Sequence, residues 1–411
     1  MLAPVNPDPL ADVVTRQYEQ WIYPAPIWDL PAWLESSWQW FDPSHAQRML
    51  WPDRDYRAGM DILVAGCGTN QAAVIAYTNP QAHVVGIDVS STSLGHHRHL
   101  AEKYDLGNLE LHRLTIEEVG SLGREFDLIM STGVLHHMAD PPAGIAALAP
   151  CLRTDGVLAL MLYATHGRIG VHMMQSVFED MGIRQDQPGI VMVRDAIDQL
   201  GPQHPLRPYL AIANDLVDDA GYMDTFIPGR ERSYTIDECR DYVETAGLVF
   251  QDVFLKTTYY APVGTASPFL AAVGRLPREQ QWSVMQRVIA NNACHFFMAC
   301  RPERPRESYA IDFDSGDPLR YVPSLRKGCT LQDDVLHQST WSRRLSPTEL
   351  MLVRQIDGAR RIREIVDAAM AAEALDESRR EEISIFAQRA FKSLWQSDFL
   401  AMGIPEGATA R

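Results

Sequence analysis

The sequence predicts an α/β fold built around a nucleoside-binding half-domain, and three observations in one stretch support this prediction. The apolar, β-branched run 62–65 predicts a buried strand that leads into a turn containing Gly66 and Gly68. Glycines let a backbone turn sharply and approach a ligand closely, and residues 71–77 then continue as a helix. A second apolar run ends at Asp88, about 20 residues after the turn, where a carboxylate can accept hydrogen bonds from ribose hydroxyls.

The elements after this stretch keep the same alternation of strands and helices. Further strands are expected at 109–114, 126–131, 156–163, 248–255 and 295–300, with a helix at 143–152. From Asp61 to Ala164, the order and spacing of the elements resemble the class I S-adenosyl-L-methionine (AdoMet)-dependent methyltransferases. The resemblance implies a Rossmann-like seven-stranded sheet and AdoMet as the cofactor.

The glycine turn is also compatible with a Rossmann-like turn that binds no ligand and with an NAD-dependent dehydrogenase. A dehydrogenase more often has a third glycine at the position of Asn70. Asparagine tolerates a positive φ better than most residues, so the turn can still bind its ligand. The resemblance assigns cofactor contacts to Gly66, Gly68, Asn70, Asp88, Thr115, Ile116, Ser131, Gly133 and Tyr23.

Three side chains are candidates for catalysis. His136 and His137 follow the fourth strand, and histidine is the usual general base because it titrates near neutrality. Either histidine can instead be purely structural in this loop. Tyr163 ends the fifth strand, where an aromatic ring could contact a cationic amine or simply pack. The loop lacks the Asn/Asp-Pro-Pro-Tyr quartet, which argues against methylation of a planar amide or a nucleobase amine.

The chain divides into regions by composition and pattern. We expect an aromatic-rich N-terminal cap (1–57), an AdoMet-binding core (58–165), a helical insertion (166–233), the end of the catalytic core (234–302), a linker (303–320) and an accessory domain (321–411). Helices are expected in the insertion at 171–181, 192–200 and 210–220, followed by a polar surface loop at 224–232. An insertion after the fifth strand lies at the edge of the sheet where ligands bind, so it is either a lid that selects substrates or a dimerisation arm.

The C-terminal region begins a helix at Ser346, with proline at the next position and Glu349 completing a capping box. Its pattern resembles small helical, winged-helix-like modules of the PqqD type, which hold peptides, although a helical dimerisation domain is the alternative. The whole layout resembles the bacterial lysine methyltransferases of the rickettsial type, which act on outer-membrane proteins.

Composition limits the classes of partner. The 411 residues carry a net charge of −16, but residues 321–411 are neutral, so the catalytic region is acidic. Nucleic-acid binding usually requires a basic surface, so we expect a neutral or cationic substrate and no nucleic acid. The six cysteines have no metal-binding spacing, and neither a membrane span nor a secretory signal is visible. We therefore expect a cytoplasmic protein with reduced cysteines and no metal.

These observations predict an AdoMet-dependent methyltransferase that methylates an amine, with lysine side chains of a protein as one candidate substrate and a homodimer as one candidate assembly. The alternatives are a small-molecule methyltransferase of secondary metabolism and a non-catalytic binding scaffold.

Overall fold

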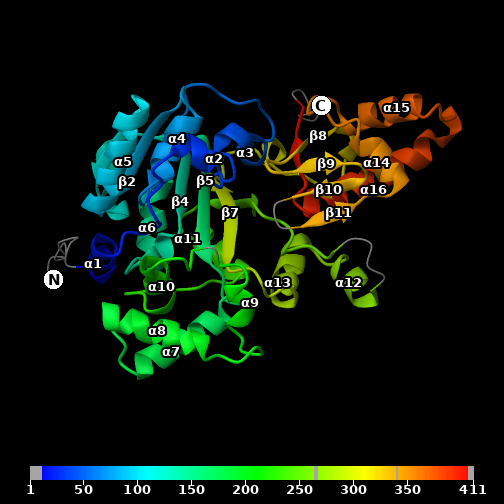
Figure 1. Cartoon of the computed structure of the whole chain (residues 1–411). Helices are drawn as coiled ribbons and strands as arrows, with labels where there is room; N and C mark the ends of the chain where they lie inside the picture. Colours follow the sequence, from blue (N-terminus) through cyan, green and yellow to red (C-terminus); the bar gives the residue numbers. More distant parts are fainter. Residues whose placement is uncertain (1–11, 214, 263–266, 339–340, 406–411) are drawn as a thin grey trace. The chain divides into compact units, whose positions relative to one another are not determined.

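The computed structural model describes residues 12–213, 215–262, 267–338 and 341–405 (Figure 1). The chain forms two compact units. The sheet unit comprises Met1–Gln39, Ala58–Phe250 and Gln286–Glu303, and the tail unit comprises Trp40–Arg57, Gln251–Met285 and Arg304–Arg411. The domain boundaries predicted from the sequence remain predictions. A compact unit does not by itself show that a segment acts as a lid or as an accessory domain.

A seven-stranded sheet in the order β3-β2-β1-β4-β5-β7-β6 confirms the Rossmann-like prediction. Its strands are β1 (Asp61–Ala65), β2 (His83–Asp88), β3 (Leu109–Arg113), β4 (Phe126–Thr132), β5 (Leu152–Tyr163), β6 (Val249–Val253) and β7 (Cys294–Cys300). Strands β1 to β5 pair in parallel, whereas β7 runs antiparallel to β5. Parallel strands need helical crossovers, which cover the faces of the sheet, so its central strands are strongly apolar.

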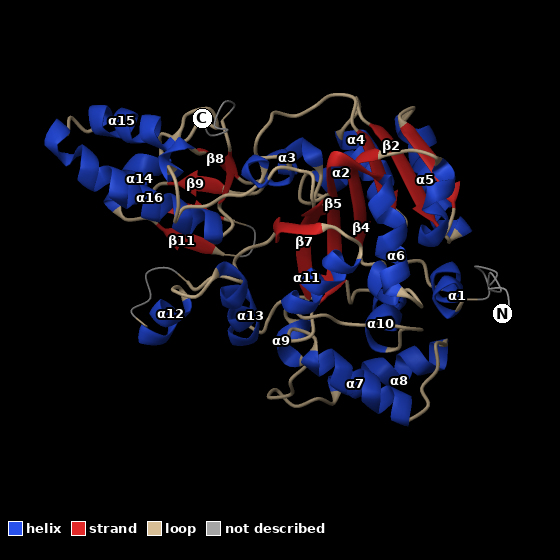
Figure 2. Ribbon diagram, turned by 180° about the vertical axis from the view of Figure 1, so that it is seen from behind, coloured by secondary structure: helices blue, strands red, loops and turns tan. Residues whose placement is uncertain are grey.

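Helices flank this sheet, as Figure 2 shows from behind. Those of the sheet unit are α1 (Val13–Gln20), α2 (Leu30–Leu34), α4 (Gln71–Thr78), α5 (Ser91–Tyr104), α6 (Pro141–Leu148), α7 (Ile169–Asp180), α8 (Gln187–Asp198), α9 (Arg207–Leu210), α10 (Asp219–Phe226) and α11 (Ile236–Thr245). Helices α1, α7, α8 and α10 gather at one end of the sheet in both views. That end is where β5 delivers the chain to the insertion, so the insertion lies beside the carboxyl ends of the parallel strands.

The insertion has its own apolar core, and two predictions about it are wrong. The helix expected at 210–220 does not form as one element, because α9 ends at Leu210 and α10 begins only at Asp219. The expected surface loop at 224–232 begins in the buried half of α10, where Asp224 and Phe226 are about as buried as any residue of the chain. Met223 and Phe226 pack with apolar residues of α7 and α8 in the core of the insertion, and this packing buries the segment.

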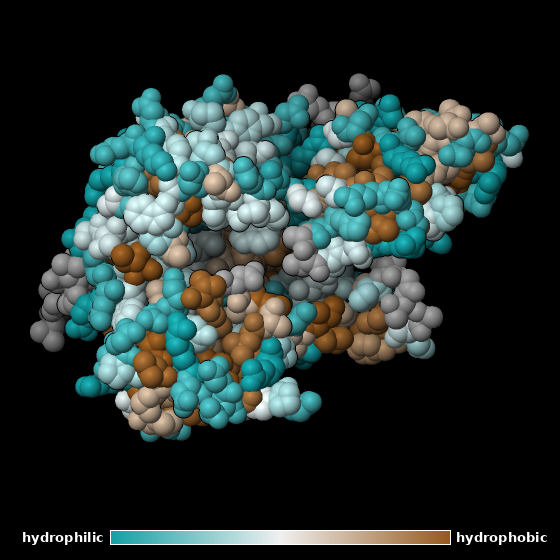
Figure 3. All heavy atoms as spheres, in the orientation of Figure 1, coloured by the Kyte–Doolittle hydropathy of each residue, from teal (hydrophilic) through white to brown (hydrophobic). Residues whose placement is uncertain are grey.

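Some apolar side chains of the insertion remain at the surface, where Figure 3 shows brown patches low in the view. An apolar side chain is exposed at every fourth position along α7 and at the residue that follows it, and α8 adds two neighbouring ones. These residues are Ile169, Met173, Val177 and Met181, and on α8 Val191 and Met192. The two roles expected for the insertion, lid and dimerisation arm, both remain predictions.

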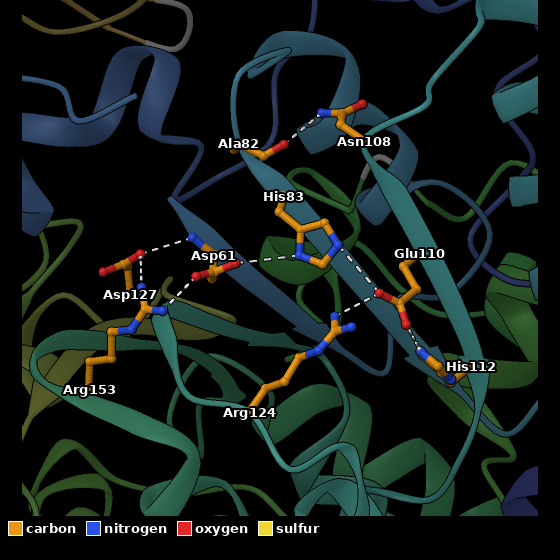
Figure 4. Close-up of polar contacts among 9 residues, drawn as sticks. All are labelled: Asp61, Ala82, His83, Asn108, Glu110, His112, Arg124, Asp127 and Arg153. Atoms are coloured by element: carbon orange, nitrogen blue, oxygen red, sulfur yellow. Dashed lines mark hydrogen bonds and ion pairs between the residues drawn. The ribbon is translucent and has the colours of Figure 1, made fainter. Parts of the chain in front are cut away.

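A chain of ion pairs crosses the amino-terminal edge of the sheet (Figure 4). Arg153 on β5 binds Asp127 at the start of β4 (2.5 Å) and Asp61 at the start of β1 (2.6 Å). His83 on β2 lies 3.4 Å from Asp61 and 3.3 Å from Glu110 on β3. Five adjacent strands are thus linked at the edge opposite the glycine turn, far from where the cofactor is expected.

The tail unit contains helices and small strands. They are α3 (Pro43–Leu50), α12 (Pro268–Val273), most of α13 (Arg278–Val288, which continues into the sheet unit from Gln286), α14 (Pro347–Val353), α15 (Ile362–Ala372), α16 (Arg380–Gln396), β8 (Val322–Leu325), β9 (Thr330–Gln332), β10 (Val335–His337), β11 (Ser342–Arg344) and β12 (Leu400–Gly403). The capping box at Ser346 is confirmed. Strands β8 to β12, which are each three or four residues long, were not predicted from the sequence.

Within the described ranges, no helix is long and apolar enough to cross a membrane. The same residues contain no group of three or more His, Cys, Asp or Glu side chains placed to hold a metal ion.

Candidate active site

The glycine turn between β1 and α4 depends on both glycines. Gly66 has φ of +73°, and a Cβ there would lie 2.5 Å from the side chain of Val134. Gly68 has φ of +55°, and a Cβ there would lie 3.2 Å from Pro24 Cδ. Any other residue at Gly66 would collide with a branched side chain in the loop after β4. The turn is therefore closely packed between that loop and the N-terminal segment.

Asn70 holds the N-terminal segment over this turn. Its side-chain oxygen accepts a hydrogen bond from the backbone N–H of Ile27 (2.8 Å), and its amide donates to the carbonyl of Ala25 (2.9 Å). The hydroxyl of Thr69 donates to the carbonyl of Pro24 (2.7 Å). With φ of −134°, Asn70 does not use the left-handed region. Its side chain anchors the cap, and a contact with the cofactor remains a prediction.

Asp88 lies at the carboxyl end of β2, beside the turn. One carboxylate oxygen accepts from the backbone N–H of Gly68 and the other from that of Ser90, both at 2.8 Å. Burial raises the pKa of Asp88 to about 6, although both N–H groups oppose this shift. Each oxygen keeps a lone pair for a further donor. The carboxylate is thus held in a fixed orientation and can accept two ribose hydroxyls.

The other predicted cofactor residues surround the same end of the sheet. Ser131 in β4 is fully buried, and its hydroxyl has no hydrogen-bond partner within the described part of the chain. Gly133 has φ of +77°, and its N–H donates to the carbonyl of Met161 (3.2 Å). Thr115 precedes the short helix at 116–122 and donates its hydroxyl to Glu118 (3.1 Å), whereas Ile116 is buried. A buried hydroxyl without a partner beside a glycine turn fits a site that a polar cofactor completes.

The two histidines differ in their surroundings. His136 is fully buried, neither ring nitrogen has a hydrogen-bond partner among the described residues, and its ring lies 3.9 Å from that of Tyr163. Burial lowers the pKa of His136 well below its usual range, so the ring is neutral. In His137, Nδ1 lies 2.7 Å from the carbonyl oxygen of Arg230. Because a carbonyl only accepts, Nδ1 carries the hydrogen, and Nε2, buried and without a described partner, has a free lone pair in the neutral ring. The hydrogen bond at Nδ1 thus fixes the ring of His137, and a role of either histidine as a base remains a prediction.

The segment 224–232, which was predicted as a surface loop, is hydrogen-bonded to the backbone of both histidines. Arg230 donates from Nε to the carbonyl of His137 (2.9 Å), and the backbone N–H of Arg232 donates to the carbonyl of His136 (3.0 Å). Once α10 is buried, the groups that follow it need hydrogen-bond partners within the protein, and the backbone of the two histidines supplies them. The prediction of an exposed loop is therefore wrong here.

A cluster of polar side chains lies between α1, β5 and α10. Tyr163 donates its hydroxyl to Asp224 (3.0 Å), and Tyr18 donates to the same carboxylate (2.7 Å). Tyr23, predicted to contact the cofactor, donates to Asp215 in the insertion (2.8 Å). The structure thus brings Tyr163 and Tyr23 into contact with carboxylates that were not predicted from the sequence.

A buried ion pair lies beside this cluster. The guanidinium of Arg168 pairs with Glu231 (2.8 Å) and lies 3.7 Å from the centre of the Tyr163 ring. One oxygen of Glu231 and Nε of Arg168 have no hydrogen-bond partner among the described residues. Arg168 and Glu231 were not predicted. The available signal for Asp224 was its place as the sole charge in the run 222–227, because an acidic residue within an apolar segment is often buried for a reason.

Comparisons with known proteins support the fold and the assignment of a methyltransferase domain. A family model described as a methyltransferase domain matches residues 57–198. The chain is 27% identical over 370 residues to a Synechococcus protein of undescribed function, with 85% of this chain and 86% of that protein covered. It is 36% identical over 125 residues to trans-aconitate 2-methyltransferase of Deinococcus radiodurans, a match that spans 30% of this chain and 45% of that enzyme. The structure of PKMT2 from Rickettsia typhi in complex with AdoHcy superposes with a TM-score of 0.65 at 14% identity, covering 88% of this chain and 75% of PKMT2.

Proposed function

We propose that this AdoMet-dependent methyltransferase transfers the methyl group to an amine nitrogen, and that the amine is a lysine side chain of a protein. The observation that carries the amine is the distribution of charge. The sheet unit has 31 acidic and 15 basic residues, whereas the tail unit has 22 of each, so the net charge of −16 belongs to the sheet unit. Such a surface attracts cationic substrates and repels carboxylates.

The polar cluster around Asp224 also carries an excess of negative charge. Its buried cation, Arg168, is balanced by Glu231. Asp224 and Asp215 instead receive tyrosine hydroxyls, and neither has an ion pair within the described residues. A cationic ligand would balance this negative charge, whereas a carboxylate substrate would add to it.

The residues of the chain have separate roles in this proposal. AdoMet supplies a methyl group on a sulfonium, and Gly66, Gly68, Asp88 and Ser131 would hold it. An ammonium must lose a proton before its nitrogen can attack, and Nε2 of His137 would accept that proton. Transfer would form the nitrogen–methyl bond and break the carbon–sulfur bond, leaving a thioether and a methylated ammonium. The other predicted contacts, from Asn70, Thr115, Ile116, Gly133 and Tyr23, and the predicted catalytic roles of His136 and Tyr163, are retained as predictions.

A lysine in a protein is the favoured amine because the layout resembles the rickettsial lysine methyltransferases and the fold extends over most of PKMT2. The tail unit would hold the protein substrate, or else join two copies of the chain. A cytoplasmic location and the absence of a nucleic-acid substrate remain part of this proposal, the latter on the same charge argument.

The second candidate is a small-molecule methyltransferase. Its support is the local match to an enzyme named trans-aconitate 2-methyltransferase, although that match covers only 45% of the enzyme. The non-catalytic scaffold is disfavoured, since Gly66, Gly68 and Asp88 are intact and a methyltransferase domain model matches residues 57–198.

Labelled AdoMet added to a lysate with the purified enzyme tests the proposal. We expect label in the protein fraction, recovered as methylated lysine after acid hydrolysis and resistant to mild alkali. An Asp88→Ala variant serves as the inactive control. Label confined to small molecules, or released by alkali as from a methyl ester, would contradict the proposal.

A further inference from the structure

Asp224 occupies an unusual environment for a carboxylate. Its side chain belongs to α10 and is only 1% exposed. One oxygen accepts the hydroxyl of Tyr18 (2.7 Å) and the amide of Gln17 (3.3 Å). The other accepts the hydroxyl of Tyr163 (3.0 Å). The donors are neutral, so no described hydrogen bond compensates the negative charge, and the charge that acts on it favourably is that of His137 when its ring is protonated.

The three elements that meet at Asp224 also bound the expected cofactor site. Tyr163 ends β5, beside β4 and its buried Ser131. Tyr18 belongs to α1, and the next residue, Glu19, accepts hydrogen bonds from the backbone N–H and hydroxyl of Ser91 (2.7 and 3.0 Å). Ser91 begins α5 and follows Asp88 by three residues. Helix α1 therefore connects the ribose side of the site with Asp224.

We propose that Asp224 is the substrate anchor: its carboxylate binds the alkylammonium group of the amine, with the rings of Tyr18 and Tyr163 beside it. This inference rests on the proposed function and adds the residue that selects the substrate. A buried carboxylate without a cation is destabilising unless a ligand neutralises it. The ring of Tyr18 can favour a cation through its negative face, whereas the ring of Tyr163 already lies 3.7 Å from the guanidinium of Arg168 and contributes its hydroxyl. The substrate class is therefore a primary or secondary alkylamine, rather than an alcohol or an acid.

The groups facing Asp224 determine its protonation. Burial raises the pKa of Asp224, and the charge of Glu231 acts in the same direction. His137 and the hydroxyls of Tyr18 and Tyr163 act in the opposite direction and lower it. An anchor must be ionised, so amine binding should be lost on the acid side as Asp224 takes up a proton. Removing a tyrosine hydroxyl should move that loss to higher pH.

The first test compares n-butylamine with n-butanol and butyrate as ligands of the full-length enzyme loaded with AdoHcy, by calorimetry. We expect binding of the amine alone. In Asp224→Asn, we expect amine affinity to fall at least about tenfold, as for loss of one charge-assisted hydrogen bond, with AdoHcy affinity unchanged. The matched control is Asp219→Asn, because Asp219 lies on the same helix but is bonded to Gln187 and Arg194 nearer the surface. Amine affinity within twofold of wild type in folded Asp224→Asn would overturn the inference.

A second variant keeps the test valid if Asp224→Asn does not fold. Tyr18→Phe retains the ring and removes only the hydroxyl, so we expect the acid limb of amine binding to shift to higher pH. An unshifted limb would overturn the inference. These outcomes are separable from failure of the proposed function. If wild type binds n-butylamine but methylates neither it nor a lysine peptide, the anchor stands and the proposed reaction is wrong.

Discussion

Replacing Asp88 by asparagine tests the cofactor site, because it removes the charge and preserves the shape of the side chain. The carboxylate already accepts N–H groups from Gly68 and Ser90, so its orientation is fixed before a ligand arrives. A hydrogen bond to a charged acceptor contributes about 1 kcal/mol more than a neutral one. For two ribose hydroxyls, the loss is about 2 kcal/mol, which corresponds to roughly thirtyfold weaker AdoMet binding.

The pH dependence gives an independent check on the same residue. In the free protein, the pKa of Asp88 is raised to about 6. Ribose hydroxyls donate to the ionised form, so the complex has a lower pKa and binding below pH 6 releases a proton. AdoMet affinity should therefore be constant above about pH 6 and fall by up to about tenfold per pH unit below it. Asp88→Asn should abolish this dependence.

Calorimetry from pH 5 to pH 8 measures both effects, with thermal unfolding to confirm that the variant is folded. Asp127→Asn is the matched control, since this carboxylate lies at the opposite edge of the same sheet. The assignment of Asp88 would be refuted if folded Asp88→Asn bound AdoMet as tightly as wild type, or if wild-type affinity did not fall below pH 6.

Two further predictions concern the histidines that follow β4 and Asp127 at the opposite edge of the sheet. His137→Ala should slow methyl transfer to an amine without changing AdoMet affinity, and the defect should shrink as pH rises and the amine deprotonates unaided. The same pH series on His136→Phe tests the catalytic role predicted for His136, because that variant keeps a ring and removes both nitrogens. A pH-independent defect in His137→Ala would return that residue to a structural role. Asp127→Asn should lower the free energy of unfolding by about 1.5–3 kcal/mol in urea titration, because Asp127 accepts from Arg153 and from the backbone N–H of Asp61. Unchanged stability would show that the ion pairs at this edge contribute little.

The sheet could be predicted from the sequence because its signals are local. Strands β1, β2 and β4 are short apolar runs that are buried on both faces, so neither their length nor their position depends on distant residues. The glycine turn and Asp88 are equally local, since the turn between β1 and α4 and the end of β2 fix where they lie. The cofactor half of the site therefore follows from one continuous stretch.

The substrate half could not be predicted in the same way. Asp224 gains its importance from Tyr18, which is 206 residues away in the sequence, and from Tyr163, which is 61 residues away. The polar letters of 224–232 indicated a surface loop, because composition records hydrophilicity but not the partners that satisfy it. Only tertiary packing shows that these polar groups face one another.

In the C-terminal region, contacts between residues far apart in the sequence also decide which experiments can be interpreted. The predicted linker at 303–320 precedes the predicted accessory domain at 321–411, and residues 40–57 and 251–285 form one compact unit with residues 304–411. Within that unit, buried Asp398 accepts the backbone N–H groups of Lys256 and Thr257 (both 2.8 Å) and pairs with Arg326. Truncation after Glu307 would leave two backbone donors and a buried core without partners, so insolubility of the truncated protein would be expected whatever the region binds. A role in holding a protein substrate must therefore be tested by substituting exposed residues of the tail unit in the full-length chain, with amine turnover as the internal reference.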